Sequence, residues 1–326
     1  MKTPLSYLYY TLTTTQRKFF QLFPFLSYRP KAKVISIGNM TTGGTGKTPV
    51  LFELIKEFSD KTTCVLTRGY RSKYENNFYV LKGENPETAL ITDESVLLNK
   101  KFPHIPILIG KNRNHSAKMA DKIIKPDILF LDDGFQYRRL KKDFNILLWD
   151  AMSEKDEARL IPLGTMREPA ELIKNADAII LTRCETASEQ KQQHWLNYLK
   201  HQAPNVQIIK AASFCDGVFD SKEEKVQLSE CISFCAIGRP NSFYAQLKSI
   251  GASAKHKFEF RDHHIFSNDE LNKITALAKT TKLPVVCTEK DYVKLDKTFI
   301  AKHNILKLRI RVRPLSRESF RSALRL

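Results

Sequence analysis

The chain has 326 residues, enough for one large or two ordinary domains with a sizeable core. Its 42% hydrophobic and 27% charged residues are close to an average soluble globular protein. No apolar run reaches the roughly 18 residues of a membrane-spanning helix, and the first residues do not read as a signal peptide. A formal charge of +18 predicts a polyanionic partner: nucleic acid, an anionic membrane face or phosphorylated substrates. The 6 cysteines are scattered without a CxxC pair, which favours a reduced cytosolic compartment.

Residues 1–30 differ in character from the rest of the chain. Leucine, tyrosine and phenylalanine recur at roughly helical spacing from Leu5 to Phe23, with Arg17 and Lys18 between them. An aromatic-rich amphipathic helix with cationic flanks is typical of a segment that lies in a membrane interface. A helix packed on the rest of the protein is the alternative. We expect the membrane-interface segment.

Apolar runs alternate with helical patterns between residues 33 and 182. Continuous apolar strands are typical of a parallel sheet covered on both faces, and the alternation predicts a doubly wound α/β domain. A polar stretch at 216–230 predicts a domain boundary, and a second, smaller α/β domain follows it. Strands are expected at 33–38, 62–67, 105–110, 127–133, 144–150 and 176–182, and helices at 49–58, 92–101 and 112–124.

The chain is therefore expected in three parts. These are the interface segment 1–30, a nucleotide-binding domain 31–215 and a smaller domain 216–326, whose tail could pack back on the first domain. The tail alternates apolar residues with Lys307, Arg309 and further cations, as in a strand with one basic face. This face is either a solvated edge protected by charge or a surface that meets an anion.

A glycine-rich segment, GGTGKT at 43–48, stands between an expected strand and an expected helix. Glycines let backbone N–H groups point at phosphate oxygens, and the helix start adds its positive dipole end. In this pattern Lys47 reaches the β- and γ-phosphates, and the Thr48 hydroxyl ligates Mg²⁺. Thr41 departs from the pattern, which has glycine there. The segment still predicts a P-loop NTPase-like fold.

The strand at 127–133 ends in Asp132 and Asp133. In P-loop enzymes an acid at the end of a neighbouring strand holds Mg²⁺, directly or through water. Turn formation explains two aspartates equally well when they are considered alone. Beside a phosphate loop we favour the metal role.

Eight further motifs follow one another along nearly the whole chain. With the phosphate loop and the N-terminal segment, they make the chain resemble the tetraacyldisaccharide 4′-kinases of lipid A biosynthesis. The sequence departs from that family at Tyr137, where histidine is common, and at Arg71 and Ser72, where glycines are common. The motifs are TRGY at 67–70, TDE at 92–94, GKNR at 110–113, DDGFQYRRL at 132–140, REP at 167–169, IGRP at 237–240, DHH at 262–264 and TEKD at 288–291.

The resemblance implies transfer of the ATP γ-phosphoryl group to the 4′-hydroxyl of a tetraacylated glucosamine disaccharide 1-phosphate, giving lipid IVA. ATP and Mg²⁺ would be the cofactors. The partners would be the lipid-linked substrate and an anionic membrane surface, with no nucleic acid and no stable protein partner. The enzyme would be peripheral on the cytoplasmic face of the bacterial inner membrane.

The resemblance also implies roles for individual residues. Asp93 would be the base, although capping of the helix that follows is the alternative. His263 would pair with Asp93 across the two domains, and the sequence barely separates it from His264. The expected ATP-binding residues are Thr41, Thr42, Gly43, Gly44, Thr45, Gly46, Lys47 and Thr48. The expected metal ligands are Thr48, Asp132, Asp133 and Glu168, and the expected substrate or phosphate contacts are Arg68, Tyr70, Arg113, Gln136 and Arg167.

Two other classes of protein compete with this interpretation. Another P-loop enzyme, such as a GTPase or a small-metabolite ligase, would share the phosphate loop, but the guanine-specifying NKxD segment is not found. A nucleic-acid-binding protein would explain the charge of +18, and aromatic and basic residues do interleave at 17–29. No recognised nucleic-acid motif accompanies them.

Overall fold

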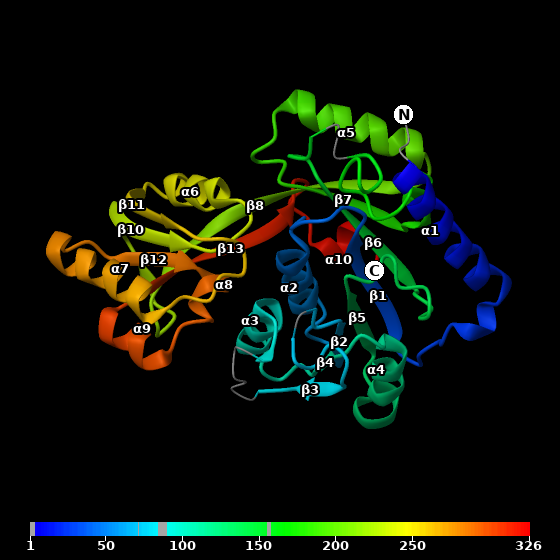
Figure 1. Ribbon diagram of the computed structural model, residues 1–326, viewed down its shortest axis with the longest axis horizontal. Coiled ribbons are helices and arrows are strands. Elements are labelled where there is room, and N and C mark those ends of the chain that lie inside the picture. Colours follow the sequence, from blue (N-terminus) through cyan, green and yellow to red (C-terminus); the bar gives the residue numbers. More distant parts are fainter. Residues whose placement is uncertain (1–3, 71, 84–89, 155–157) are drawn as a thin grey trace. The chain divides into compact units, whose positions relative to one another are not determined.

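The computed structural model describes residues 4–70, 72–83, 90–154 and 158–326 (Figure 1). The chain forms two compact units. The first comprises Met1–Asn85, Phe102–Ser213 and Val312–Leu326, and the second comprises Pro86–Lys101 and Phe214–Arg311. Both are α/β units built on largely parallel strands, which confirms the predicted fold class. None of the described helices is long and apolar enough to cross a bilayer.

The sheet of the first unit runs in the order β8-β7-β6-β1-β5-β2-β4-β3. The strands from β7 to β4 pair in parallel, and β3 pairs with β4 in the antiparallel direction. Its central strands are continuous buried runs, as the sequence predicts. The strands are β1 (Lys33–Asn39), β2 (Thr63–Thr67), β3 (Tyr79–Leu81), β4 (Ile107–Ile109), β5 (Ile128–Asp132), β6 (Phe144–Asp150), β7 (Ala178–Thr182) and β8 (Gln207–Phe219), which continues into the second unit.

Helices cover both faces of this sheet. Leu129 of β5 belongs to the apolar cluster under α4, whereas the next residue, Phe130, points to the other face and meets Phe58 at the end of α2. Trp195 of α5 packs against the same face as Leu129, further along the sheet. The helices are α1 (Pro4–Leu22), α2 (Lys47–Glu57), α4 (Arg113–Met119), α5 (Glu189–Gln202) and α10 (Phe320–Ala323), with helical turns at Pro24–Leu26, Ala120–Ile124 and Ala170–Asn175.

The second unit has a parallel sheet in the order β11-β10-β12-β13. Apolar clusters around Phe234 and around Phe243 form its core. Its strands are β9 (Lys225–Val226), β10 (Glu230–Cys235), β11 (Ser253–Glu259), β12 (Val285–Thr288) and β13 (Leu306–Pro314), and its helices are α3 (Asp93–Lys101), α6 (Pro240–Ser249), α7 (Asn268–Thr281), α8 (Glu289–Tyr292) and α9 (Lys297–His303).

The division of the chain differs from the expected ranges 31–215 and 216–326. The units divide between Ser213 and Phe214, close to the boundary expected at 215/216, but within strand β8, which continues to Phe219 and pairs with β9. Residues 86–101 belong to the second unit, although the sequence places them in the first. Residues 312–326 belong to the first unit, in agreement with the expectation that the tail could pack back on it. Each unit is therefore discontinuous in sequence.

The basic strand at the end of the chain is partly neutralised. Lys307 and Arg309 of β13 both form ion pairs with Glu223, and Arg309 also pairs with Glu289 at 3.2 Å. These partners lie within the second unit. They favour a charge-protected strand over a surface that meets an external anion.

Candidate active site

The segment 43–48 forms a loop between β1 and α2, as predicted. Gly43 and Gly46 adopt φ angles of 98° and 84°, which side-chain-bearing residues rarely reach. A Cβ atom at Gly43 would meet nothing within 4 Å, so the requirement for glycine there is conformational and not steric. The Asn39 side chain donates to the Thr41 carbonyl at 2.8 Å. The loop is thus fixed at its entry and open above Gly43.

The neighbouring strand β7 supports the other side of the loop. The Thr182 hydroxyl donates to the Thr45 carbonyl at 3.0 Å, and Arg183 donates to the Gly44 carbonyl at 2.7 Å. Arg183 also pairs with Asp150 at the end of β6. Because these bonds engage loop carbonyls, they leave the backbone N–H groups as the donors for a phosphate. Sequence motifs gave no indication of this support.

Lys47 lies in a cluster of charged and polar side chains. Its ammonium group donates to the Asn39 side chain at 3.0 Å and lies 3.4 Å from Asp133. Arg167 approaches the same carboxylate with two guanidinium nitrogens, at 2.9 and 3.0 Å. A bidentate arginine–carboxylate pair is strong and directional. The structure therefore brings together Lys47, Asp133 and Arg167, which the sequence predicts in three separate motifs.

The electrostatics of Asp133 follow from this cluster. Burial disfavours the charged carboxylate, but the Arg167 hydrogen bonds and the charge of Lys47 outweigh it and keep the pKa of Asp133 below its ordinary value. Asp133 also adopts a positive φ of 49°, so it sits at a tight turn after β5. Near neutral pH this carboxylate is an anion beside the phosphate loop.

Asp132 and Gln136 lie on the same turn. The Thr67 hydroxyl donates to Asp132 at 3.2 Å, and the Gln136 amide donates to the Asn39 carbonyl at 2.7 Å. No three His, Cys, Asp or Glu side chains gather as a metal site in the described residues. Mg²⁺ at a phosphate site is usually held by one or two carboxylates with substrate phosphates. The oxygens of Thr48 and the two aspartates are hard donors that fit this ion, and Asp133 would exchange contacts with Arg167 or Lys47 to bind it.

Glu168 has neighbours other than the phosphate loop. Its carboxylate forms an ion pair with Arg138, and burial raises the pKa of the carboxyl group despite that pair. Lys142 lies close by and donates to the Phe135 carbonyl at 2.8 Å, and burial lowers the pKa of its amine to about 7. A metal role for Glu168 stays a prediction, and it would compete with Arg138 for the carboxylate.

The three remaining predicted contacts lie in two groups. The guanidinium of Arg68 forms an ion pair with Glu75 at 2.8 Å and lies 5.3 Å from the ring centre of Tyr70. Arg113 is buried, and its guanidinium stacks 4.2 Å from the ring centre of Tyr137. Tyr137, where the sequence departs from the family pattern, thus supplies the aromatic face that supports Arg113.

The predicted acid–imidazole pair forms in the second unit. Nδ1 of His263 lies 3.1 Å from Oδ2 of Asp93. His264 instead contacts Glu270 at 3.0 Å and stacks on Phe260, so the structure places His263 and not its neighbour beside the aspartate.

The sequence led us to expect that this pair bridges the two units, but both residues lie in the second unit. That expectation is wrong because the helix that begins at Asp93 belongs to the second unit. Capping does not explain Asp93 either. The Thr92 hydroxyl accepts the N–H of Ser95 at 3.3 Å, which leaves the Asp93 carboxylate for side-chain partners.

Two lysines complete this cluster. Lys290 lies in the TEKD motif, for which the sequence suggested no role, and Lys294 lies outside every motif. Lys294 lies 3.3 Å from Oδ2 of Asp93, and Lys290 lies 3.3 Å from Nε2 of His263. Burial disfavours the charged form of Asp93, yet the His263 hydrogen bond and the two lysine charges keep the pKa of its carboxyl low. For His263 the Asp93 hydrogen bond dominates and raises the pKa, against burial and the charge of Lys290.

Comparison with known proteins shows the family to which this chain belongs. A sequence model of the tetraacyldisaccharide-1-P 4′-kinases matches residues 1–326. The chain belongs to this kinase family. It is 32% identical over 299 residues to the tetraacyldisaccharide 4′-kinase of Halothermothrix orenii, covering 84% of this chain and 78% of that protein. It is 31% identical over 308 residues to the enzyme of Elusimicrobium minutum, covering 90% and 82%.

A solved structure agrees with the sequence comparison. The crystal structure of LpxK from Aquifex aeolicus in complex with ATP aligns with a TM-score of 0.75 and 26% identity, covering 99% of this chain and 96% of that one. As a member of the 4′-kinase family, the chain is a phosphotransferase of lipid A biosynthesis that uses ATP. The GTPase, ligase and nucleic-acid alternatives are not favoured.

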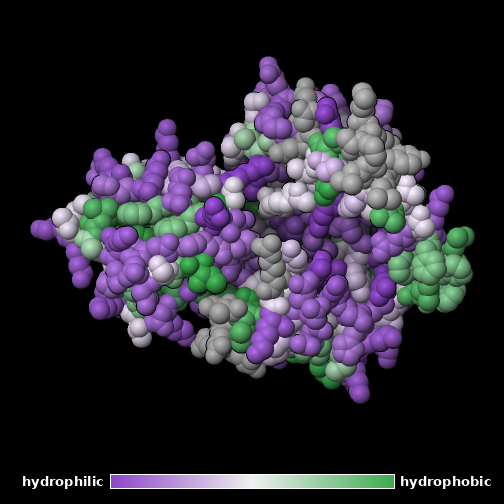
Figure 2. Space-filling model, in the orientation of Figure 1, coloured by the Kyte–Doolittle hydropathy of each residue, from purple (hydrophilic) through white to green (hydrophobic). Residues whose placement is uncertain are grey.

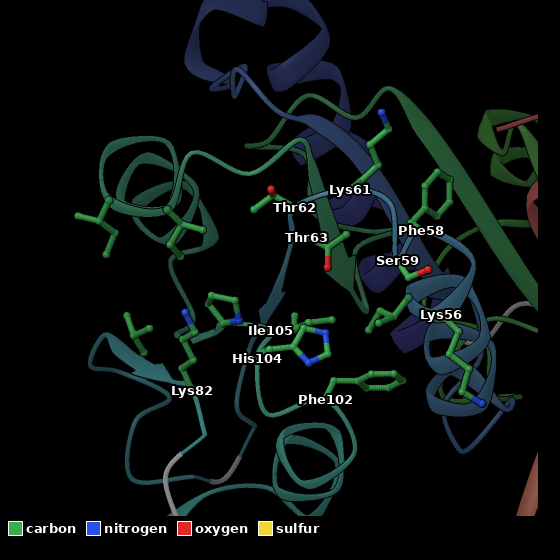
Figure 3. A pocket seen from close by; sticks show the side chains of 15 residues that line it. Lys56, Phe58, Ser59, Lys61, Thr62, Thr63, Lys82, Phe102, His104 and Ile105 are labelled. Atoms are coloured by element: carbon green, nitrogen blue, oxygen red, sulfur yellow. The ribbon is translucent and has the colours of Figure 1, made fainter.

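A separate cavity of about 550 Å³ lies in the first unit of this 4′-kinase (Figure 3). Lys56, Lys82, Phe102 and His104 are among its lining residues. It lies at the amino ends of β2 and β4, where Thr63 begins a strand, whereas the phosphate loop follows the carboxyl end of β1. The cavity contains none of the predicted site residues.

Proposed function

We propose that this kinase uses the loop at 43–48 to hold ATP and Asp93 to accept the proton of the acceptor's 4′-hydroxyl group. The observation that carries the proposal is the position of the Asp93 carboxylate, which His263 and Lys294 hold at 3.1 and 3.3 Å. A carboxylate oriented in this way is suited to general base catalysis.

In the first unit, which would bind the nucleotide, Lys47 and Arg167 place positive charge where phosphate oxygens would lie. Phosphoryl transfer depends mainly on positioning and on neutralising the charge that spreads over the transferred group. The backbone N–H groups of the loop and the start of α2 add further donors. Thr48, Asp132 and Asp133 would hold Mg²⁺, which when bound neutralises charge on the β- and γ-phosphates.

In the second unit, the 4′-hydroxyl group of the acceptor loses its proton to Asp93. The oxygen then forms a bond to the γ-phosphorus, and the bond from that phosphorus to the departing ADP breaks. A hydrogen bond from Nδ1–H of His263 to the carboxylate, whose atoms lie 3.1 Å apart, would fix the direction of the base. Arg68, Tyr70 and Arg113 are proposed as contacts for substrate or nucleotide phosphate, because arginine guanidinium groups match phosphate geometry.

The membrane part of the proposal rests on the first residues of the chain. Large apolar side chains are exposed along α1 and the turn Pro24–Leu26, and Figure 2 shows them as a hydrophobic patch at the right of the view. Arg17 and Lys18 flank them, and each cation near an anionic surface contributes about 1 kcal/mol. Their exposed fractions are Leu12 62%, Phe19 47%, Leu22 74%, Phe23 40%, Phe25 77% and Leu26 42%.

We propose that this segment docks the enzyme on the cytoplasmic face of the inner membrane. The acyl chains of the substrate stay in the bilayer, so the catalytic groups must reach the membrane surface. The Tyr9 hydroxyl in α1 donates to the Arg167 carbonyl at 2.9 Å, which ties the segment directly to the nucleotide half. Apolar insertion with charge attraction gives reversible binding.

The test is transfer of labelled phosphate from ATP to a tetraacyldisaccharide 1-phosphate in mixed micelles, with the product position mapped. Phosphate on the 4′-oxygen is expected, and Asp93→Asn should lower kcat by about 10²- to 10⁴-fold. Phosphate at another position, or an Asp93→Asn variant within a few-fold of wild type, would overturn the proposed chemistry.

A further inference from the structure

Lys290, in the short helix α8, is held beside His263 by three partners. Its ammonium nitrogen lies 3.3 Å from Nε2 of His263, 3.3 Å from a carboxylate oxygen of Asp262 and 3.3 Å from one of Glu94. Its side chain is only 21% exposed. Two carboxylates on two different segments therefore keep this lysine charged and fixed against the imidazole ring.

The ammonium group of Lys290 bears on which nitrogen of the His263 ring carries the proton. An ammonium group has three donors and no acceptor, so Nε2 of His263 must accept the hydrogen bond from Lys290. The ring proton of neutral imidazole then lies on Nδ1, from which it is donated to Oδ2 of Asp93 at 3.1 Å. The Asp93 carboxylate, which has no donor, favours the same tautomer from the other side. Without Lys290, the Asp262 carboxylate, 3.8 Å from Nε2, would compete for a proton on that nitrogen.

The ring depends on these partners for its orientation. The His263 side chain is 53% exposed, so packing does not fix it. Its backbone holds a positive φ of 62°, with the N–H donating to the Ala236 carbonyl at 3.3 Å, and this aims the side chain at α3 and α8. The contacts to Asp93 and Lys290 then set the ring from both sides.

We propose that Lys290 is a positioning residue that fixes the Nδ1–H tautomer of His263 and thereby keeps Asp93 unprotonated and aimed for catalysis. The proposal rests on the role of Asp93 as the base. Lys290 acts through the imidazole, and the groups it neutralises, Glu94 and Asp262, would otherwise face that ring as bare carboxylates.

The balance of charge gives the direction of the effect. The Asp93 hydrogen bond raises the pKa of His263, and so do the charges of Glu94 and Asp262, whereas burial and the charge of Lys290 lower it. Lys294 is the remaining cation that faces this cluster, through Asp93. Removing the charge of Lys290 should raise the pKa of His263 further. A protonated His263 would then form an ion pair with Asp93 and lower the basicity of the carboxylate.

The direct experiment is ¹⁵N NMR of histidine-labelled full-length protein, with the His263 signals assigned from a His263→Gln variant. Wild type should show the Nδ1–H tautomer. Lys290→Met should show a mixture of tautomers and a His263 titration midpoint raised by about one pH unit. Lys290→Arg, which keeps a charged donor, should restore the wild-type spectrum. Lys273→Met, at an exposed position of α7, is the matched control.

Kinetics separate this proposal from the proposed function. The acid limb of the kcat profile for Lys290→Met should move up by about one pH unit, a loss of about tenfold at pH values below the new midpoint. An unchanged tautomer and midpoint in Lys290→Met would overturn the positioning role. A raised KM for the disaccharide with an unchanged His263 spectrum would overturn it too, and would assign Lys290 to substrate contact. If the NMR changes occur but the kcat profile does not move, Asp93 is not the base.

Discussion

The exposed apolar patch at the end of α1 gives the most quantitative prediction. Leu22 and Phe25 are 74% and 77% exposed, so replacing both with serine should hardly change the stability of the fold. Full burial of such a side chain contributes roughly 1.5–3 kcal/mol, and three quarters of that is about 1–2 kcal/mol for each residue. The double variant should therefore lose about 2–4 kcal/mol of membrane binding. At about 1.4 kcal/mol for each factor of ten, this is roughly 30- to 1,000-fold.

The assay is co-sedimentation with vesicles at low and high salt, using anionic and neutral lipids. An interfacial side chain reaches only the headgroup and acyl boundary, so the lower value, about 30-fold, is the expected loss. Ile123→Ser is the control, because Ile123 is 54% exposed in the first unit but lies outside the segment. Wild-type binding by the double variant, or an equal loss in the control, would refute the assignment of the membrane contact to α1.

Three further outcomes follow from the two halves of the site. Lys47→Ala should lower kcat on the order of a hundredfold or more, measured by phosphate transfer at saturating ATP, and activity within a few-fold of wild type would contradict its role. The double variant Asp93→Ala/His263→Ala should be little worse than the poorer single variant, because residues that act as a unit are non-additive. Fully multiplied losses in kcat would show that the two act independently. Asn replacement of Asp132 or Asp133 should raise the Mg²⁺ concentration for half-maximal activity, and unchanged titrations in both would count against a metal role.

The sequence predicts the fold well where its signal is a long apolar run. The central strands of the first unit are such runs, and all of them form. The short strand Tyr79–Leu81 was missed because three residues carry too little pattern. Helix α5 was missed because, in a 14-residue segment rich in Gln, Lys and His, only Trp195 and Leu199 are buried. Two buried residues make too narrow an apolar stripe for the sequence to predict an amphipathic helix.

For the candidate site residues too, the sequence predicts some and misses others. The glycine-rich segment points to Lys47 as a candidate, whereas Asp93 and His263 are expected through the family resemblance. Helical periodicity says that a helix forms at 93–101 but not which sheet it packs on, so its unit was assigned wrongly. Lys290 lies in α8, and Lys294 lies in the turn that follows it. Their partners come from α3 and the 262–264 loop, which no local pattern could reveal.

The two groups of candidate residues are each held together by contacts inside one unit. Asp93 is fixed by His263 and Lys294 within the second unit, and Asp133 by Arg167 and Lys47 within the first. Loss of one group should therefore leave the geometry of the other intact, and ATP affinity should survive changes at Asp93. The N-terminal segment, for which we propose membrane docking, belongs to the first unit and is bonded to it through the Arg167 carbonyl. Because Arg167 also pairs with Asp133, docking of that segment would act on the phosphate-loop cluster of the same unit.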